Sequence, residues 1–287
     1  MSTTTPELIL VVPASVAGGV IHLATTKNPT SYADGFFQAE IEDLGNLVAH
    51  GTFTGRVEAE DNPEFKQLIV YTAVFFQGNI LSYTRGKVGQ EPRLHAKQSI
   101  GVGGHINPED WDISLPDAEI FHGAVRRELK EEVGITDSHI NRMQFIGFVN
   151  EDTTDVGKVH FGLVFFVDLN HIEGLAFEEA FLNPRWLEED ELDSNHELEV
   201  WSGAVRDALL KAGREEQEQL SASGMLPHQI RVAQECAALD DNITKLDAFI
   251  GGEKYDQLDS AEQDRLNRQR LHMRHYSEVL HERICAW

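Results

Sequence analysis

The chain is poor in cysteine, in positive charge and in long apolar runs, and each shortage excludes a class of protein. Among 287 residues, Cys236 and Cys285 are the two cysteines, so the sequence offers no disulfide framework and no zinc-ligand spacing. Lysine and arginine together number 24 against 48 acidic residues, which gives a net charge of −24. General binding to nucleic-acid phosphates needs a basic surface, which this chain lacks, and an anionic membrane surface is a poor partner for the same reason.

The N-terminal stretch MSTTTPELILVVPAS shows how short the apolar runs are. It has no basic leader, and its apolar run is too short for a signal peptide or a membrane span. An apolar content of 41% is nevertheless enough for a substantial core. We therefore expect a soluble, cytoplasmic protein.

Hydrophobic periodicity predicts an α/β domain over residues 1–210. Strands are expected at 7–12, 66–76, 80–86, 143–152 and 158–169, and helices at 36–49, 118–133 and 196–212. A tight turn at Gly78-Asn79 joins two of the strands, and the polar stretch from Asn183 to Leu192 is expected to be a loop. Strands around one central helix, with a further helix at the end, indicate an α/β sandwich.

The C-terminal part has a different pattern. Residues 211–225 are charged and without apolar period, which predicts a linker, and residues 226–287 predict an antiparallel helical hairpin. The first helix of this hairpin carries a heptad seam of Val232, Cys236, Leu239, Ile243, Leu246 and Ile250. Such a hairpin holds its two cysteines too far apart to form a disulfide. Its seam could pack internally, dock on the first domain or join two copies into a homodimer.

The stretch RRELKEEVGI, residues 126–135, places three carboxylates on one helical face. Glu128, Glu131 and Glu132 would repel one another by a few tenths of a kcal/mol per pair unless a cation neutralises them. Carboxylate oxygens are the ligands that Mg²⁺ or Mn²⁺ prefers, and these ions bridge phosphate oxygens. Arg127 lies four residues before Glu131, at the spacing of an ion pair, and Gly134 permits a left-handed helix end.

From Glu119 to Ile135 the chain reads E-x7-R-E-L-K-E-E-V-G-I. This resembles the Nudix box, G-x5-E-x7-R-E-U-x-E-E-x-G-U, in which U is aliphatic. Ile113 stands where the box has its first glycine. If Gly104 takes that place, the box spans 104–135 with a loop insertion at 105–118. Trp111 or Asp112 of the insertion would then contact substrate, unless the insertion is a surface excursion.

The resemblance implies a Nudix-type α/β/α sandwich with a mixed sheet, and it implies an activity. That activity is Mg²⁺- or Mn²⁺-dependent hydrolysis of a diphosphate linkage in a nucleoside diphosphate derivative, by attack of a metal-activated water. The implied metal ligands are Glu128, Glu131, Glu132 and the carbonyl of Gly104. The implied catalytic residues are Glu128, Glu131, Arg127 and Glu119. The general base stays open between Glu128, Glu119 and, outside the box, Glu151.

A wider resemblance covers roughly residues 7–210. The phrases RGK, RLH and GVGGHIN are similar to those of a Nudix subgroup described as predicted phosphoesterases. Within them, Arg85, Lys87, Arg93 and His95 form a basic patch between a strand and the glycine run, where a bound phosphate could be reached. The predicted substrate-binding residues are Arg85, Arg93, His95, Lys158 and His160. A simpler interpretation is that the basic patch consists of surface charges and that His160 is an ordinary, partly buried histidine.

Residues 226–287 resemble a helical module common in bacteriophage-encoded proteins. A phage enzyme would work in the host bacterial cytoplasm, where it could degrade a host nucleotide signal. Two other functions remain open: a sensor that binds a nucleotide without turning it over, and an isomerase of an isoprenyl diphosphate. The box-bearing domain has no cysteine, which removes one acid that such isomerases use.

Overall fold

The computed structural model describes residues 7–28, 35–86, 96–111, 117–194, 198–222 and 225–287. The chain divides into two compact units, Met1–Ala212 and Gly213–Trp287. Helix α6 (Val200–Ala222) begins in the first unit and continues past this boundary. The first part of the stretch predicted as a linker, residues 211–222, is therefore helical.

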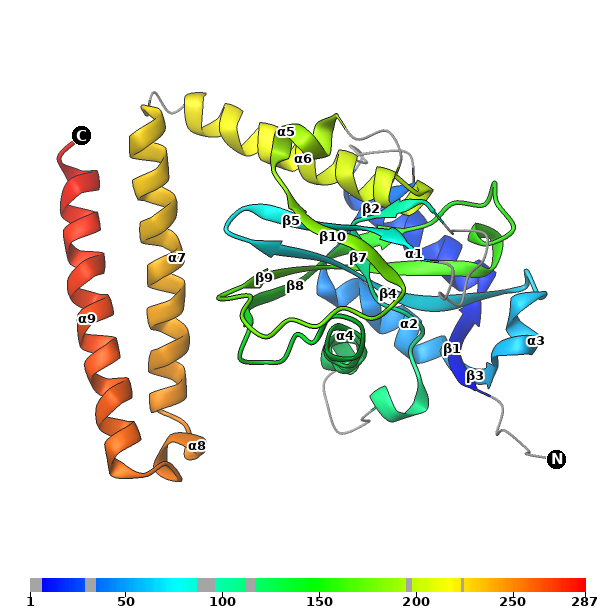
Figure 1. Ribbon diagram of the computed structural model, residues 1–287, viewed down its shortest axis with the longest axis horizontal. Coiled ribbons are helices and arrows are strands. Elements are labelled where there is room, and N and C mark those ends of the chain that lie inside the picture. The colour runs from blue at the N-terminus through cyan, green and yellow to red at the C-terminus, as the bar shows by residue number, and fades with distance from the viewer. Residues whose placement is uncertain (1–6, 29–34, 87–95, 112–116, 195–197, 223–224) are drawn as a thin grey trace. The chain divides into compact units, whose positions relative to one another are not determined.

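The first unit is built on one mixed sheet (Figure 1). Its main path runs in the order β10 (Phe181–Leu187), β5 (Asn79–Arg85), β4 (Phe65–Phe76), β9 (His160–Leu169), β8 (Ile140–Val149) and β2 (Phe36–Gln38). Strands β4 and β9 are parallel, and the other pairs along this path are antiparallel. Four further strands pair beside this path: β1 (Leu8–Pro13), β3 (Thr52–Gly55), β6 (Gln98–Ser99) and β7 (Gly101–Val102).

Helices cover both faces of the sheet (Figure 1). Helices α1 (Ala14–Lys27), α2 (Gly45–His50) and α4 (Asp117–Val133) contribute to one apolar core, whereas α5 (Glu189–Asp193) and the first half of α6 contribute to the other. Strand β4 serves both cores: Val70 and Val74 lie in the first, and Tyr71 and Ala73 in the second. Side chains of a strand alternate between faces, which is how one strand supplies two cores. The predicted α/β/α sandwich with a mixed sheet is confirmed.

Helix α4 positions the carboxylates of the box. Its buried stripe repeats every three or four residues and consists of Phe121, Ala124, Val125, Leu129 and Val133. This amphipathic spacing anchors the helix against the sheet. Helix α4 ends at Val133, and the next residue, Gly134, has a φ of +72°, so the predicted left-handed helix end is confirmed.

Three local predictions need correction, and one helix was missed. The predicted helix at 36–49 is instead β2, a 3-10 turn (Ile41–Leu44) and the short α2. Helix α1 was not predicted. The hairpin turn between β4 and β5 is at Gln77-Gly78, with φ of 52° and 84°, one residue earlier than expected. The predicted loop at 183–192 contains most of the edge strand β10, whose register shifts around Pro184, as proline in a strand usually requires.

The second unit is a helical hairpin of α7 (Pro227–Ile250) and α9 (Ser260–Cys285), joined through the short α8 (Glu253–Asp256). Its buried apolar core is small: Val232, Cys236 and Leu280, with Leu239 and Ile284 packed against them. Both cysteines are free thiols. Within the described ranges, no helix is both long and apolar enough to cross a membrane.

Candidate active site

The glycine run Gly101–Gly104 lies between β4 and the carboxylates of α4. Gly103 has a φ of +149°, and a Cβ there would lie 1.9 Å from the carbonyl oxygen of Val70. The carbonyl of Gly104 accepts a hydrogen bond of 3.0 Å from the N–H of Val70. On its other side, a Cβ at Gly104 would lie 2.7 Å from a carboxylate oxygen of Glu128. The missing side chain at Gly103 therefore lets the glycine run approach β4, and the missing side chain at Gly104 lets Glu128 approach the run.

The three box glutamates differ in burial. Glu128 is 9% exposed, and its Oε1 accepts a hydrogen bond of 2.8 Å from Nη1 of Arg127. Glu131 is exposed and accepts from the same Nη1 at 3.1 Å, as the spacing predicts. Glu132 is largely buried, and its Oε2 accepts the N–H of Gly103 at 3.1 Å. The buried pair thus lies against the glycine run, and the third carboxylate is open to solvent.

Arg127 is the centre of this network. Its Nε and Nη2 donate to the two carboxylate oxygens of Asp110, both at 2.8 Å, and Nη2 also donates to the carbonyl of His105 at 2.9 Å. Bidentate pairing of this kind fixes the guanidinium plane. Nε, Nη1 and Nη2 of Arg127 therefore all donate to groups of the protein itself.

Asp110 was not among the predicted site residues, although it lies in the segment predicted as an insertion. It is buried and ends the 3-10 turn Pro108–Asp110, where its Oδ2 accepts the N–H of Asn107 at 2.8 Å. The stretch Asn107-Pro108-x-Asp110 carries the turn signal of a capping box. The sequence pattern could have located the turn, but not its contact with Arg127.

The electrostatics of the site favour a bound cation. Burial, followed by the nearby charge of Glu128, raises the pKa of Glu132 to about 8. Burial also raises the pKa of Glu128, against the opposing effect of Arg127. Two carboxylates with raised pKa values offer hard oxygen donors of the kind that suits Mg²⁺ or Mn²⁺. The residues present therefore fit the metal that the box implies.

A cavity of about 920 Å³ opens beside these glutamates. Its described lining runs from Glu7 to Trp201, all in the first unit. Nine lining residues are acidic: Glu7, Glu128, Glu131, Glu132, Glu151, Asp155, Glu178, Glu179 and Glu199. Three are arginines: Arg56, Arg85 and Arg127. The described part of the lining is thus strongly acidic.

The predicted substrate-binding residues have different positions. Arg85 lines the cavity, but its guanidinium pairs with the buried Glu199 at 2.8 and 3.2 Å. His160 also lines the cavity, with Nδ1 2.7 Å from the carbonyl oxygen of Val156. Lys158 is exposed, pairs with Asp155 at 3.0 Å and is not part of the described lining. Arg93 and His95 lie outside the described residues.

Glu151, one of the candidates for the general base, lines the cavity on the loop after β8. Partial burial raises the pKa of its carboxylate, but hydrogen bonds from Thr153 and Thr154 outweigh this effect and hold the pKa below its usual value. A carboxylate with a low pKa and occupied oxygens is a poor proton acceptor. The side chain of Glu119, another candidate, lies outside the described residues.

Of the insertion residues expected near substrate, Trp111 packs edge-on against Phe53, with ring centroids 5.8 Å apart, and is not part of the described lining. Asp112 lies outside the described residues. Tyr83 and His105 also line the cavity, and Tyr83 stacks on Phe181 with ring centroids 3.9 Å apart. Burial, with the nearby charges of Arg56, His160 and Arg127, lowers the pKa of His105 well below its usual value.

Comparison with known proteins agrees with this architecture. The model of the NUDIX domain matches residues 70–209, and a model named Sequestin matches residues 226–286. The protein YmaB of Bacillus subtilis (strain 168) is 34% identical over 158 residues, which are 54% of this chain and 76% of YmaB. The Sequestin match supports a fused helical module at the predicted position. The bacteriophage origin of this module stays a prediction.

Among solved structures, the crystal structure of Tm1382, described as a candidate Nudix hydrolase, superimposes with a TM-score of 0.57 and 27% identity. The match covers 72% of this chain and all of Tm1382. The domain match, the curated relative and this fold agree with the box on α4. The chain belongs to the Nudix family and is a Nudix hydrolase.

Proposed function

We propose that the protein hydrolyses a diphosphate linkage in a nucleoside diphosphate derivative, and that it requires Mg²⁺ or Mn²⁺. The observation that carries this proposal is the set of three carboxylates on one face of α4, Glu128, Glu131 and Glu132, at the edge of an acidic cavity. With the carbonyl of Gly104, they are the proposed metal ligands.

The charge of the cavity supports the requirement for a metal. Among the described residues that line it, nine are acidic and three are arginines, and a diphosphate brings further negative charge. All three arginines already pair with carboxylates of the protein: Arg56 with Glu7, Arg85 with Glu199 and Arg127 with Asp110. An anionic substrate would therefore be repelled unless divalent cations enter with it. When bound here, Mg²⁺ or Mn²⁺ supplies charge for the phosphate oxygens and lowers the pKa of the attacking water.

The contacts of the side chains suggest a role for each. Arg127 is a positioning residue, because its three nitrogens donate to Asp110, Glu128, Glu131 and the His105 carbonyl. Glu128 is the proposed general base, because burial raises its pKa above the usual value and it lies next to the glycine run. The low pKa of Glu151 argues against that residue.

The cavity is also suited to a nucleoside. Its volume of about 920 Å³ lies in the range of about 300–1,000 Å³ typical of small-molecule sites. The stacked rings of Tyr83 and Phe181 form part of its wall, with Tyr71 and Trp201. Aromatic walls with a few polar groups are the usual lining of a site for a base or a sugar.

The proposal is tested by phosphate-product release from a panel of nucleoside diphosphate derivatives, with Mg²⁺ or Mn²⁺, for wild type and Glu132→Gln. We expect the substitution to lower kcat about 100-fold or more, because it removes a charged metal ligand. Glu173→Gln is the matched control, since Glu173 is 84% exposed and pairs with His171 away from the cavity lining.

Three outcomes separate the functions. Turnover that needs the metal, is lost in Glu132→Gln and survives in Glu173→Gln supports the hydrolase. Turnover that is unchanged in Glu132→Gln contradicts the proposed site. No turnover on any compound, together with tight binding of one nucleotide, identifies a sensor instead.

A further inference from the structure

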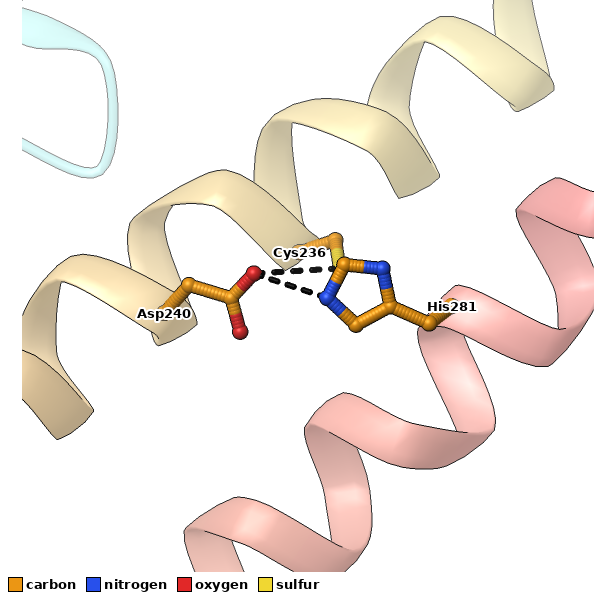
Figure 2. Close-up of side chains that lie close together, drawn as sticks. All are labelled: Cys236, Asp240 and His281. Carbon is orange, nitrogen blue, oxygen red and sulfur yellow. Dashed lines mark hydrogen bonds and ion pairs between the residues drawn. The ribbon is translucent and has the colours of Figure 1, made fainter.

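Three side chains of the helical hairpin bring different donor atoms together from two helices (Figure 2). Cys236 and Asp240 lie one turn apart on α7, and His281 faces them from α9. Cys236 Sγ is 3.9 Å from Oδ2 of Asp240, and Nε2 of His281 is 2.8 Å from the same oxygen. A sulfur, an oxygen and a nitrogen donor all lie within 4.8 Å of one another.

These distances are close to those of a tetrahedral metal site. Zinc binds Cys, His and Asp donors at about 2.0–2.3 Å, which places neighbouring donors about 3.3–3.5 Å apart. The contacts of 3.9 and 2.8 Å each differ from this by about 0.5 Å, and the third pair, Cys236 with His281, lies within 4.8 Å, so side-chain rotations would bring the donors to metal-binding distance. The side chains of Asp240 and His281 are 41% and 57% exposed, which leaves a fourth position open to solvent.

The surroundings of Asp240 hold one of its oxygens in the required place. Its Oδ1 accepts a hydrogen bond from the hydroxyl of Ser277 on α9, and its Oδ2 is directed to Cys236 and His281. A polar contact that merely pairs the helices would need only Asp240 and His281. The buried thiol of Cys236 adds a soft donor at the third corner.

We propose that Cys236, Asp240 and His281 bind a divalent transition-metal ion of the zinc class, with solvent or an external donor at the fourth position. A thiolate and an imidazole select such an ion over Mg²⁺, in contrast to the carboxylates of α4. The bound ion joins α7 to α9, where the apolar core is small. Because it binds the folded hairpin only, it stabilises that fold.

The test is a titration of reduced, metal-free, full-length protein with Co²⁺, followed by the thiolate-to-cobalt charge-transfer absorption in the near ultraviolet. Both cysteines of the chain are in the hairpin, so the carboxylate site of the first unit cannot give this signal. We expect the absorption to report one Co²⁺ site per chain, since any Co²⁺ held by the carboxylates of α4 adds no thiolate charge transfer. Added Zn²⁺ should remove the absorption, whereas Mg²⁺ should leave it unchanged.

Variants assign the signal to residues. Cys236→Ser should abolish the absorption, and His281→Gln and Asp240→Asn should each weaken Co²⁺ binding at least about tenfold. Cys285→Ser and His275→Gln are the controls, since Cys285 is the other, exposed thiol and His275 is exposed on the same helix. Both should bind as wild type does.

Three results would overturn the proposal: wild type shows no charge-transfer absorption, the absorption survives in Cys236→Ser, or it is lost in Cys285→Ser. Circular dichroism checks the fold of each variant. If Cys236→Ser does not fold, Asp240→Asn decides the question, because its side-chain oxygen can still accept from Ser277. Unweakened Co²⁺ binding by a folded Asp240→Asn would also contradict the site.

Discussion

Glu132 is a largely buried carboxylate whose charge is opposed by its neighbour Glu128. Burial and that neighbour raise its pKa from the usual 4.5 to about 8. Between these two values, the folded metal-free protein holds a proton that the unfolded chain has lost. The free energy of unfolding should therefore fall as the pH rises from 4.5 to 8, by up to about 1.4 kcal/mol per pH unit from this group.

This dependence can be measured by urea unfolding in EDTA at pH 5.5 and pH 8. We expect wild type to lose more stability between the two pH values than Glu132→Gln, which cannot ionise. The net charge of −24 also destabilises the fold as the pH rises, so the difference between the two proteins is the quantity that matters. Equal losses in both proteins would contradict the raised pKa.

Asp110 is the residue that fixes Arg127, and Arg127 in turn fixes Glu128 and Glu131. Asp110→Asn keeps the shape but removes the charge that the guanidinium pairs with at 2.8 Å. We expect kcat to fall about 10–100-fold, the usual effect of losing a residue that orients metal ligands. The Mg²⁺ concentration for half-maximal activity should rise as well. Glu109→Gln, at the exposed neighbouring position, is the control, and an Asp110→Asn enzyme that matches it would refute this role.

At the scale of elements, two neighbouring glycines should affect different properties of the protein. Gly103 should matter for stability, and Gly104 for metal binding. A Cβ at Gly103 would meet the Val70 carbonyl at 1.9 Å, in a backbone conformation with φ of +149°. Gly103→Ala should therefore destabilise the fold by about 1–3 kcal/mol or more. At Gly104 the Cβ would meet the end of the Glu128 side chain, which can move away.

Gly104→Ala should for this reason cost about 1 kcal/mol or less in stability, yet raise the Mg²⁺ concentration needed for activity. Urea unfolding of Gly103→Ala and Gly104→Ala measures their stability, and activity titrated with Mg²⁺ measures their metal requirement. The prediction fails if Gly104→Ala has the larger effect on stability, or if it needs no more Mg²⁺ than wild type.

Elements with a strong apolar period could be predicted from the sequence. Strands that form because they pair with a neighbouring strand could not. The stretch 66–76 alternates between two cores and is rich in β-branched and aromatic residues, so β4 was recognisable. Strand β10 contains Pro184 and charged residues, which an edge strand with a register shift tolerates. In the stretch 36–49, helical spacing was overridden because Phe36–Gln38 pairs with β8.

Charged residues of the site could likewise be predicted where they are local in sequence, but not where they pair with distant residues. The three box glutamates are local in sequence, so their shared face could be predicted. Arg85 looked available to a phosphate, because its partner Glu199 is 114 residues away. Asp110 and Arg127 are 17 residues apart, and Asp240 and His281 are 41 apart. Pairings over such separations depend on the fold, which no short pattern records.

At the scale of the whole molecule, the two units have separable chemistry. Each described residue that lines the cavity lies between Glu7 and Trp201, in the first unit. The first half of α6 belongs with that unit, because Ala204, Val205 and Ala208 are buried in its second core. A chain that ends at Ala222 therefore keeps every described residue of the cavity lining and the helix that covers this core.

We expect the chain that ends at Ala222 to keep kcat/KM within about threefold of the full-length enzyme, a difference of less than 1 kcal/mol in transition-state stabilisation. A chain that ends at Leu198 removes α6 and exposes the apolar residues that it covers, so it should not fold to a stable enzyme. Activity assays and circular dichroism of both chains beside the full-length protein make the comparison. A loss of more than tenfold in the longer chain, with its fold intact, would show that the hairpin takes part in hydrolysis after all.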